Sequence, residues 1–136
     1  MHLHLETSVV PLRLGVATRS GHPIVLSLWY LWLDGALWCA TVAEADVVAH
    51  LRRDPRCGFE VASERPPYCG VRGRGRAAID VSRGEEMLRA LLRRYQGGED
   101  GPLARWLLTR AAREVAIRIA PDRLVSWDYR ERMRAG

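Results

Sequence analysis

Residues 23–41 constrain the fold of this chain more than any other stretch. They contain two apolar segments joined by Asp34-Gly35, and a two-residue hairpin loop needs positive φ angles that glycine adopts without steric cost. The first segment, 24–33, is apolar on both faces apart from Ser27, which predicts one strand covered on both sides. The stretch also holds three of the five tryptophans, Trp29, Trp32 and Trp38. We expect a hairpin in the middle of a small barrel, with a surface for a partner chain.

The size and composition favour one globular domain over residues 1–136, in which 1–10 and 129–136 are loosely ordered. The chain is 48% hydrophobic and 27% charged, which is ordinary for a protein with a real core. Its net charge is +5, and all 21 basic residues are arginine. This balance favours an anionic ligand such as a phosphate, but no basic run is present, so nucleic acid is an unlikely partner.

The cysteines and the N-terminal sequence indicate the cellular compartment. Cys39, Cys57 and Cys69 are odd in number and lack zinc-site spacing, which predicts buried thiols in a reducing cytoplasm. We predict no signal peptide and no membrane helix, because no apolar run is long enough. His2 and His4 form an HxH pair that could chelate a metal, but a frayed terminus is the simpler interpretation, and no metal site is predicted.

Hydrophobic periodicity predicts the remaining elements. Strands are expected at 11–18, 56–63, 68–81, 113–120 and 124–127, and helices at 43–53, 82–97 and after Pro102. Ser82 is the expected N-cap, with Glu85 as capping partner, and Leu103, Trp106 and Leu107 should lie on one side of the last helix. Six or seven mostly antiparallel strands and two to three helices make a mainly β, α+β fold, whose apolar sheet must close.

Three arginines at a spacing of two, Arg72, Arg74 and Arg76, line one face of the strand at 68–81. They could bind a phosphate or carboxylate, or they could pair with Asp80, Glu60 or Glu64 on neighbouring strands or lie in water. Gly73 and Gly75 on the opposite face leave room for another backbone or a large side chain to approach closely, and we expect a tryptophan there.

Other side chains have two interpretations each. Trp29, Tyr30 and Trp32 could stack on a planar ring, or pack in the core and a dimer interface. Trp127 could close over such a ring or plug the barrel. Ser27 could donate to a bound ring or bond its own sheet. His22 and His50 could be acid–base groups or incidental. No nucleophile motif and no metal-binding motif is visible, so no catalytic residue is assigned.

The order of several phrases resembles one known family. They are Gly21-His22-Pro23 leading to Trp29-Tyr30-Leu31-Trp32, Asp34-Gly35-Ala36-Leu37, Ala40-Thr41, Leu51-Arg52-Arg53-Asp54-Pro55-Arg56, Val71-Arg72-Gly73-Arg74, and Ile117-Arg118-Ile119 running to Val125-Ser126-Trp127-Asp128. Over about 11–128 the chain resembles the pyridoxamine 5′-phosphate oxidase-like, FMN-binding split β-barrel superfamily, which includes flavin- and deazaflavin-dependent oxidoreductases. The resemblance implies a six- to seven-stranded antiparallel split β-barrel.

The resemblance also implies a homodimer that binds FMN or a deazaflavin in a groove between two barrels. The ring would rest on 25–30, and a Ser-Arg-Lys-like stretch at a helix start would hold the phosphate. Thr41 matches the family's threonine, but the Ser-Arg-Lys positions carry Ala45, Asp46 and Val47, and Glu44 precedes them. Losing two charge-assisted hydrogen bonds weakens FMN binding on the order of a hundredfold.

The resemblance and the side-chain patterns above together give nine candidate cofactor contacts. They are Ser27, Leu28, Trp29, Thr41, Asp46, Val47, Arg72, Arg74 and Trp127. The first functional hypothesis is an oxidoreductase that passes a hydride between the ring and a small organic substrate over the Trp29 side. The alternative is a non-catalytic split-barrel module that has lost the phosphate site and binds another planar ligand or a protein partner.

Overall fold

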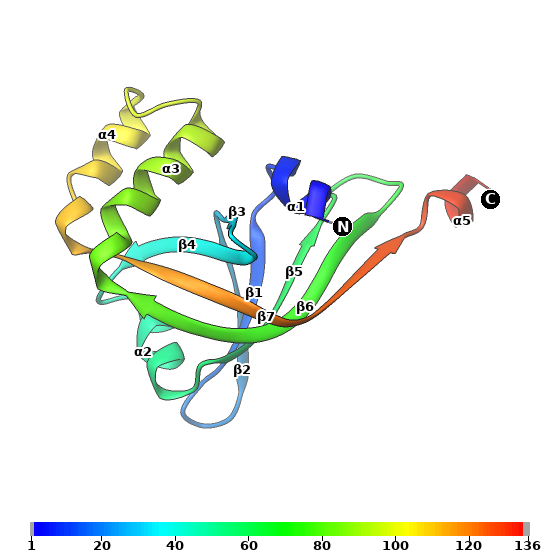
Figure 1. Ribbon diagram of the computed structural model, residues 1–136, viewed down its shortest axis with the longest axis horizontal. Helices are drawn as coiled ribbons and strands as arrows, with labels where there is room; N and C mark the ends of the chain where they lie inside the picture. Colours follow the sequence, from blue (N-terminus) through cyan, green and yellow to red (C-terminus); the bar gives the residue numbers. More distant parts are fainter. Residues whose placement is uncertain (1, 135–136) are drawn as a thin grey trace.

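A computed structural model describes residues 2–134, and the side chains of residues 4–132 (Figure 1). In this part of the chain seven strands form one sheet in the order β2-β1-β5-β6-β7-β4-β3. They are β1 (Leu12–Ala17), β2 (Pro23–Leu28), β3 (Leu31–Leu33), β4 (Ala36–Val42), β5 (Arg56–Ala62), β6 (Cys69–Asp80) and β7 (Glu114–Asp128). Every pair of neighbours is antiparallel, which confirms the predicted sheet.

Three main helices accompany the sheet, as predicted: α2 (Asp46–Arg53), α3 (Gly84–Gln96) and α4 (Pro102–Leu108). Figure 1 shows α3 and α4 together at one end of the long strands β6 and β7. Two short helices, α1 (His2–Thr7) and α5 (Arg130–Arg134), lie near the chain ends, and 3₁₀ turns occupy Val81–Arg83 and Ala111–Arg113. No helix in the described range is both long and apolar enough to cross a membrane.

The expected strand at 24–33 is two strands, and this prediction was wrong. β2 pairs with β1 and β3 pairs with β4, so these two strands occupy the two ends of the sheet order. Only Trp29 and Tyr30 lie between them, which brings the two ends of the sheet together at this link. The turn was predicted correctly: Asp34 has φ 52° and Gly35 has φ 70°, and they join β3 to β4.

β2 is not covered on both faces in the single chain, contrary to the prediction. Val25 is 72% exposed and Ile24 is 38% exposed, because β2 is at one end of the strand order and pairs only with β1. An apolar sequence shows that a strand favours burial, but it does not show that another element covers the strand. In β2 the apolar side chains of Ile24 and Val25 remain exposed.

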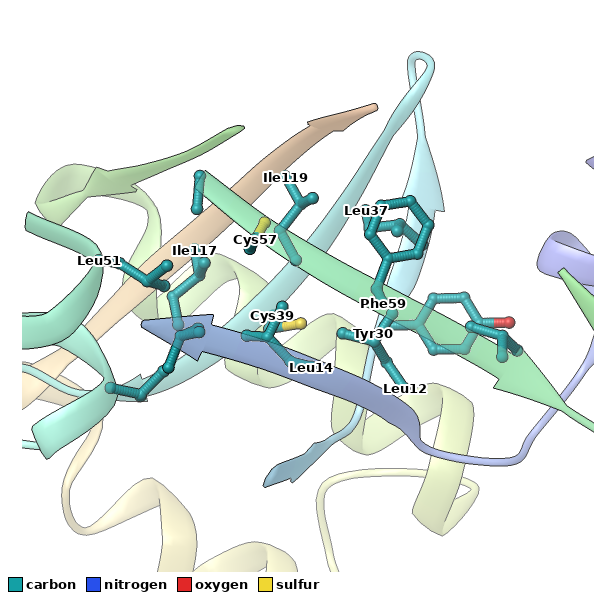
Figure 2. Packing of buried hydrophobic residues seen from close by; sticks show 14 of the residues in the cluster. Leu12, Leu14, Tyr30, Leu37, Cys39, Leu51, Cys57, Phe59, Ile117 and Ile119 are labelled. Atoms are coloured by element: carbon teal, nitrogen blue, oxygen red, sulfur yellow. The ribbon is translucent and has the colours of Figure 1, made fainter. Parts of the chain in front are cut away.

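The core lies on the concave face of the sheet, where large apolar side chains from five strands meet (Figure 2). Leu14, Phe59 and Ile117 are central members, and Val48 and Leu51 of α2 close one side. The sequence folds this way because inward residues alternate along β1, β5 and β7. Burying a side chain of this size stabilises the fold by about 1.5–3 kcal/mol relative to leaving it exposed.

The N-terminal segment, which we expected to be loose, forms α1 and packs on the barrel. Leu5 is fully buried, and its carbonyl oxygen accepts a hydrogen bond from the Tyr30 hydroxyl at 2.8 Å. The Arg94 guanidinium donates to the carbonyl oxygens of Leu5, Glu6 and Ser8. Burial raises the pKa of Tyr30 to about 12. At the other end, residues 130–134 are helical and 135–136 lie outside the described residues.

Three local predictions were wrong. The position opposite Gly73 is filled by the ring of Phe59 and the β7 backbone, not by a tryptophan. Ser82 does not cap α3; instead the Asp80 carboxylate accepts hydrogen bonds from the backbone N–H and the hydroxyl of Ser82. The strands expected at 113–120 and 124–127 are one continuous strand, β7, paired along β6 with an irregularity between Arg74 and Gly75.

Helix α4 packs on the protein through its smallest apolar side chain. Ala104 is buried, whereas Leu103 and Trp106 are 44% and 56% exposed. The small alanine side chain allows α4 to approach α3, since Ala104 packs in one cluster with Leu88 and Leu92. Leu103 and Leu107 line a cavity beside this contact.

Candidate functional site

A cavity of about 330 Å³ lies between the end of β2, the end of β4 and the helices α3 and α4. We call it the α3–α4 cavity. Four of the nine predicted contacts line it, Ser27, Leu28, Trp29 and Thr41. The structure brings these four together because the link at Trp29 and Tyr30 turns the end of β2 toward β4. Leucines 88, 91, 103 and 107 form its apolar wall.

The Trp29 side of this cavity is held in place by a stack of rings. The Trp29 and Tyr95 rings are 5.2 Å apart and nearly parallel, at 7°. The Tyr95 hydroxyl donates to the Val10 carbonyl oxygen at 3.1 Å and accepts from the Tyr30 backbone N–H at 3.3 Å. Trp29 is thus half-buried by its own chain, and its remaining surface is turned to the cavity.

The cavity also contains an ion pair that sequence reasoning missed. The Glu114 side chain is only 2% exposed, and its Oε1 lies 3.8 Å from Nη2 of Arg110. Within the described residues, Glu114 Oε2 and Arg110 Nε are buried and have no hydrogen-bond partner. Burial raises the pKa of the Glu114 carboxyl, although Arg110 and Arg113 act in the opposite direction.

The backbone explains how a carboxylate comes to be buried here. A Cβ at Gly84 would lie 2.7 Å from the Val115 nitrogen, so only glycine lets the first turn of α3 lie against the start of β7. Helix α3 therefore covers the face of β7 that carries Glu114 and Ala116, and both are buried. In the sequence Glu114 simply alternates with apolar residues, and no signal marks its face as covered.

The arginine ladder lies on the same outer face of the sheet as Glu114, but its three arginines do not line this cavity. Arg74, Arg76 and Arg56 line a groove of about 630 Å³ whose floor includes Gly15 and Gly58. We call it the arginine groove. A neighbouring hollow of about 450 Å³ is lined by Arg72, Arg74 and Arg123 among others.

In the range that the structure describes, no ion pair involves Arg72, Arg74 or Arg76. Of the expected partners, Glu64 lies 4.0 Å from Arg13 and Asp80 bonds Ser82, whereas Glu60 is directly opposite Arg72 on β5 without an ion pair. Cross-strand pairing also places Arg123 opposite Arg74, and Arg76 opposite Arg56, which is paired with Asp54. Like charges directly opposite repel each other, so the part of this face around Arg74 favours an anion, with Glu60 and Asp122 at its borders.

Two glycines in the floor of the groove are not required by packing within the chain. A Cβ on Gly15 or Gly58 would meet its nearest neighbour at 3.7 or 3.8 Å, which is ordinary contact. At Gly70, by contrast, a Cβ would come within 2.7 Å of the Val61 oxygen. Glycine in a strand interior costs about 0.5–1 kcal/mol relative to alanine, so a smooth floor here favours the close approach of something outside the chain.

The remaining predicted contacts lie elsewhere. Trp127 lines a third cavity of about 500 Å³ with Thr7 and Cys69, and its indole Nε1 is buried without a partner in the described range. Asp46 is exposed in the first turn of α2, and Val47 is buried in the core. The structure therefore leaves Trp127, Asp46 and Val47 apart from the α3–α4 cavity.

The start of α2 does not fit a phosphate. Its N-cap residue, Ala45, makes no side-chain hydrogen bond to the helix, and Asp46 adds a negative charge to the first turn. Glu44 beside it already pairs with Arg113, with N–O distances of 3.2 and 3.3 Å, and this bond lowers the pKa of the Glu44 carboxyl. An incoming phosphate would meet two carboxylates there.

Of the described histidine side chains, only His4 lines one of these cavities. His22 lies in the β1–β2 turn, and His50 faces Arg53 on α2 at 3.5 Å. His4 lines the Trp127 cavity and its Nε2 donates to the Val61 carbonyl oxygen at 3.1 Å. The side chain of His2 lies outside the described residues, and no metal-binding cluster occurs among the side chains that are described.

Comparison with known proteins gives structural matches only. No protein-family model and no curated protein matches the sequence. The conserved hypothetical protein Rv2991 from Mycobacterium tuberculosis is 25% identical, with a TM-score of 0.76 over 93% of this chain and 82% of that one. An F420 reductase is 21% identical, with a TM-score of 0.70 over 89% and 93%. A candidate pyridoxamine 5′-phosphate oxidase from Listeria innocua is 19% identical, with a TM-score of 0.64 over 85% and 86%.

These similarities extend over nearly the whole chain and agree with the strand order and helix positions described above. The solved structures that resemble this protein are pyridoxamine 5′-phosphate oxidase-like split-barrel proteins. The chain therefore has the pyridoxamine 5′-phosphate oxidase-like split-barrel fold.

Proposed function

We propose that the protein is a flavin- or deazaflavin-dependent oxidoreductase that binds its cofactor between two copies of the barrel. The observation that carries this proposal is the arginine groove, a smooth-floored, basic hollow on an uncovered sheet face. Structurally similar proteins include an F420 reductase, which supports redox chemistry on this scaffold. A bound flavin or deazaflavin would supply the hydride chemistry that no side chain of this protein can supply.

The arginines would hold the anionic part of the cofactor. Arg72, Arg74 and Arg123 line one hollow together with Glu60, and none of these arginines forms an ion pair among the described residues, so each is available for a charge-assisted hydrogen bond to phosphate. This differs from the helix-start site that the family resemblance implied, because Ala45 and Asp46 do not fit a phosphate. The flat part of the cofactor would cross Gly15 and Gly58 toward β2.

The end of β2 would orient the reacting partners. The Ser27 hydroxyl accepts from Arg13 Nη1 at 2.9 Å, which leaves its own O–H available to donate to a ring. Leu28 and Trp29 would exclude water, and the Thr41 hydroxyl lies in the same cavity. Trp127 lines a separate cavity, so this proposal gives it no contact with the cofactor.

A second copy would cover the exposed apolar strand β2. Val25 lies in the same cross-strand row as Gly15, Gly58 and Arg74, so a partner that covers Val25 would also roof the groove. A homodimer is therefore part of the proposal. The three free thiols, of which Cys39 and Cys57 are buried, suit a reducing compartment such as the cytoplasm.

Spectroscopy of the purified protein tests this function. We expect flavin-type absorbance, or a spectral shift on titration with FMN or a deazaflavin, together with a dimer in native mass spectrometry. Arg74→Ala should weaken cofactor binding about tenfold through one lost charge-assisted bond, whereas Arg52→Ala on α2 should leave it unchanged. A colourless protein that shifts with neither cofactor would overturn the proposal.

A second candidate is a non-catalytic binding module, and the start of α2 favours it. Glu44 and Asp46 leave that helix start negative, where the resemblance implied a phosphate site. If the site has only lost its cations, Asp46→Arg combined with Glu44→Gln should create or tighten FMN binding. Val47 is left unchanged, because it is buried and a lysine there would disturb the core. Unchanged affinity in the double variant would exclude this helix start as the former phosphate site.

A further inference from the structure

We propose that the α3–α4 cavity binds a small uncharged molecule that carries an N–H group beside a C=O group on an apolar body. Glu114 would accept the N–H, and Arg110 would donate to the carbonyl oxygen. An amide, a lactam and a cyclic urea are the simplest groups of this class. This molecule would be the substrate of the proposed oxidoreductase, because the cavity is on the Trp29 side, where the substrate is expected. Only this assignment as substrate rests on the proposed function.

The polar end of the cavity is incomplete in a specific way. Glu114 and Arg110 are 3.8 Å apart at their nearest atoms, which exceeds a hydrogen bond. Glu114 Oε2 and Arg110 Nε are both buried and unpartnered in the described range. Both side chains line the same 330 Å³ space, so one unbonded acceptor and one unbonded donor belong to the residues at its polar end. A buried polar group without a partner destabilises the structure, so a ligand that bonds both side chains gains from each bond.

The two charges exclude charged ligands of either sign. An anion would be drawn to Arg110 but would meet the buried Glu114 carboxylate, and a cation would meet Arg110. A neutral group with a donor next to an acceptor leaves the ion pair intact and satisfies both free atoms. The Arg110 guanidinium is held 4.9 Å over the Trp106 ring, which fixes the donor's position.

The rest of the cavity sets the ligand's body. Leu88, Leu91, Leu103 and Leu107 form one wall and Trp29 faces them, so the space is apolar beyond the ion pair. The volume accommodates a single ring with one substituent and is at the small end for ligand pockets. Leu103 at the mouth is 44% exposed and would be covered further by a bound molecule.

The test uses benzamide and benzoate as probes on the full-length protein without added cofactor. The two probes share a ring and a carbonyl carbon, but only benzamide offers an N–H. Affinities are measured by NMR titration, following the Trp29 indole and the Glu114 backbone amide. We expect benzamide to bind more tightly than benzoate by about tenfold or more, since each charge-assisted bond is worth about that factor.

Glu114→Gln supplies the decisive comparison. The neutral side chain no longer repels an anion, so the preference should reverse, with benzoate drawn to Arg110. Glu44→Gln is the matched control, because Glu44 is exposed, pairs with Arg113 and should leave both affinities unchanged. An unaltered preference in Glu114→Gln, or no shift at either reporter, would overturn the inference. If benzamide binds as expected while no flavin or deazaflavin does, the site stands and only its assignment as a substrate site fails.

Discussion

Replacing Glu114 by glutamine should make the protein more stable at neutral pH. The carboxylate is 2% exposed, 3.8 Å from its only cation partner in the described part of the chain, and has one oxygen unbonded. Desolvation outweighs the attraction of Arg110 and Arg113, since the pKa of Glu114 is raised. Removing such a charge while keeping the side-chain shape is expected to raise the free energy of unfolding by about 1–3 kcal/mol.

The stability that Glu114→Gln gains should depend on pH. A carboxyl whose pKa is higher in the folded than in the unfolded state binds its proton more tightly when folded, so the wild type loses stability as pH rises from about 4.3 through the folded pKa. Below pH 4 the group is protonated in both states, and the variant should have no advantage. The difference in the free energy of unfolding between the variant and the wild type should increase as pH rises, and it should stay constant above the folded-state pKa of Glu114.

Thermal melting by circular dichroism at pH 4 to 8, with urea unfolding at pH 7, measures the effect. The melting temperature should rise by roughly 4 °C for each kcal/mol at this chain length. Glu44→Gln is again the control and should show the opposite pH trend, because the Arg113 hydrogen bond lowers the pKa of Glu44. If Glu114→Gln were less stable than wild type at pH 7, or gained as much at pH 4 as at pH 7, the desolvation argument would be refuted.

Three further predictions concern other parts of the molecule. Tyr30→Phe removes the buried 2.8 Å hydrogen bond to Leu5 and should lower the free energy of unfolding by about 1 kcal/mol in urea titrations, where no change would mean that water replaces the bond. Val25→Arg places a charge on the exposed apolar edge and should convert a dimer to monomers in analytical ultracentrifugation; a persistent dimer would locate the interface elsewhere. The Asp54 carboxyl, held by hydrogen bonds from Arg56, should titrate with a pKa of about 2 by NMR, so its favourable contribution to folding is present above about pH 4 and is lost as pH falls toward 2.

Much of the fold could be predicted from sequence because its signals are local. Asp34-Gly35 specifies the turn, and the alternation along 56–63 and 113–120 specifies inward faces, all of which occur in the structure. The errors arise where a distant element decides the outcome. β2 looks buried because its residues are apolar, yet nothing in the single chain covers Val25.

The site was only partly predictable for the same reason. Ser27, Leu28 and Trp29 follow one another in sequence, and Thr41 joins them because the link at Trp29 and Tyr30 brings the two ends of the sheet together. Glu114 and Arg110 could not be recognised, since their burial depends on α3 packing across the start of β7 at Gly84. A charged residue becomes informative only when its surroundings are known, and here those surroundings come from a helix that begins 30 positions earlier (Gly84 to Glu114).

The two-residue link between β2 and β3 has a consequence for how the site responds to distant changes. Trp29 forms a wall of the α3–α4 cavity, while its neighbour Tyr30 is fixed inside the barrel and bonded to α1. Trp29 and Tyr30 are adjacent in one short link. A ligand that displaces the Trp29 indole should therefore also displace Tyr30 and strain its hydrogen bond to Leu5 of α1. Detachment of that helix should in turn loosen the pocket, which makes a segment far from any ligand a sensor of whether the pocket is filled.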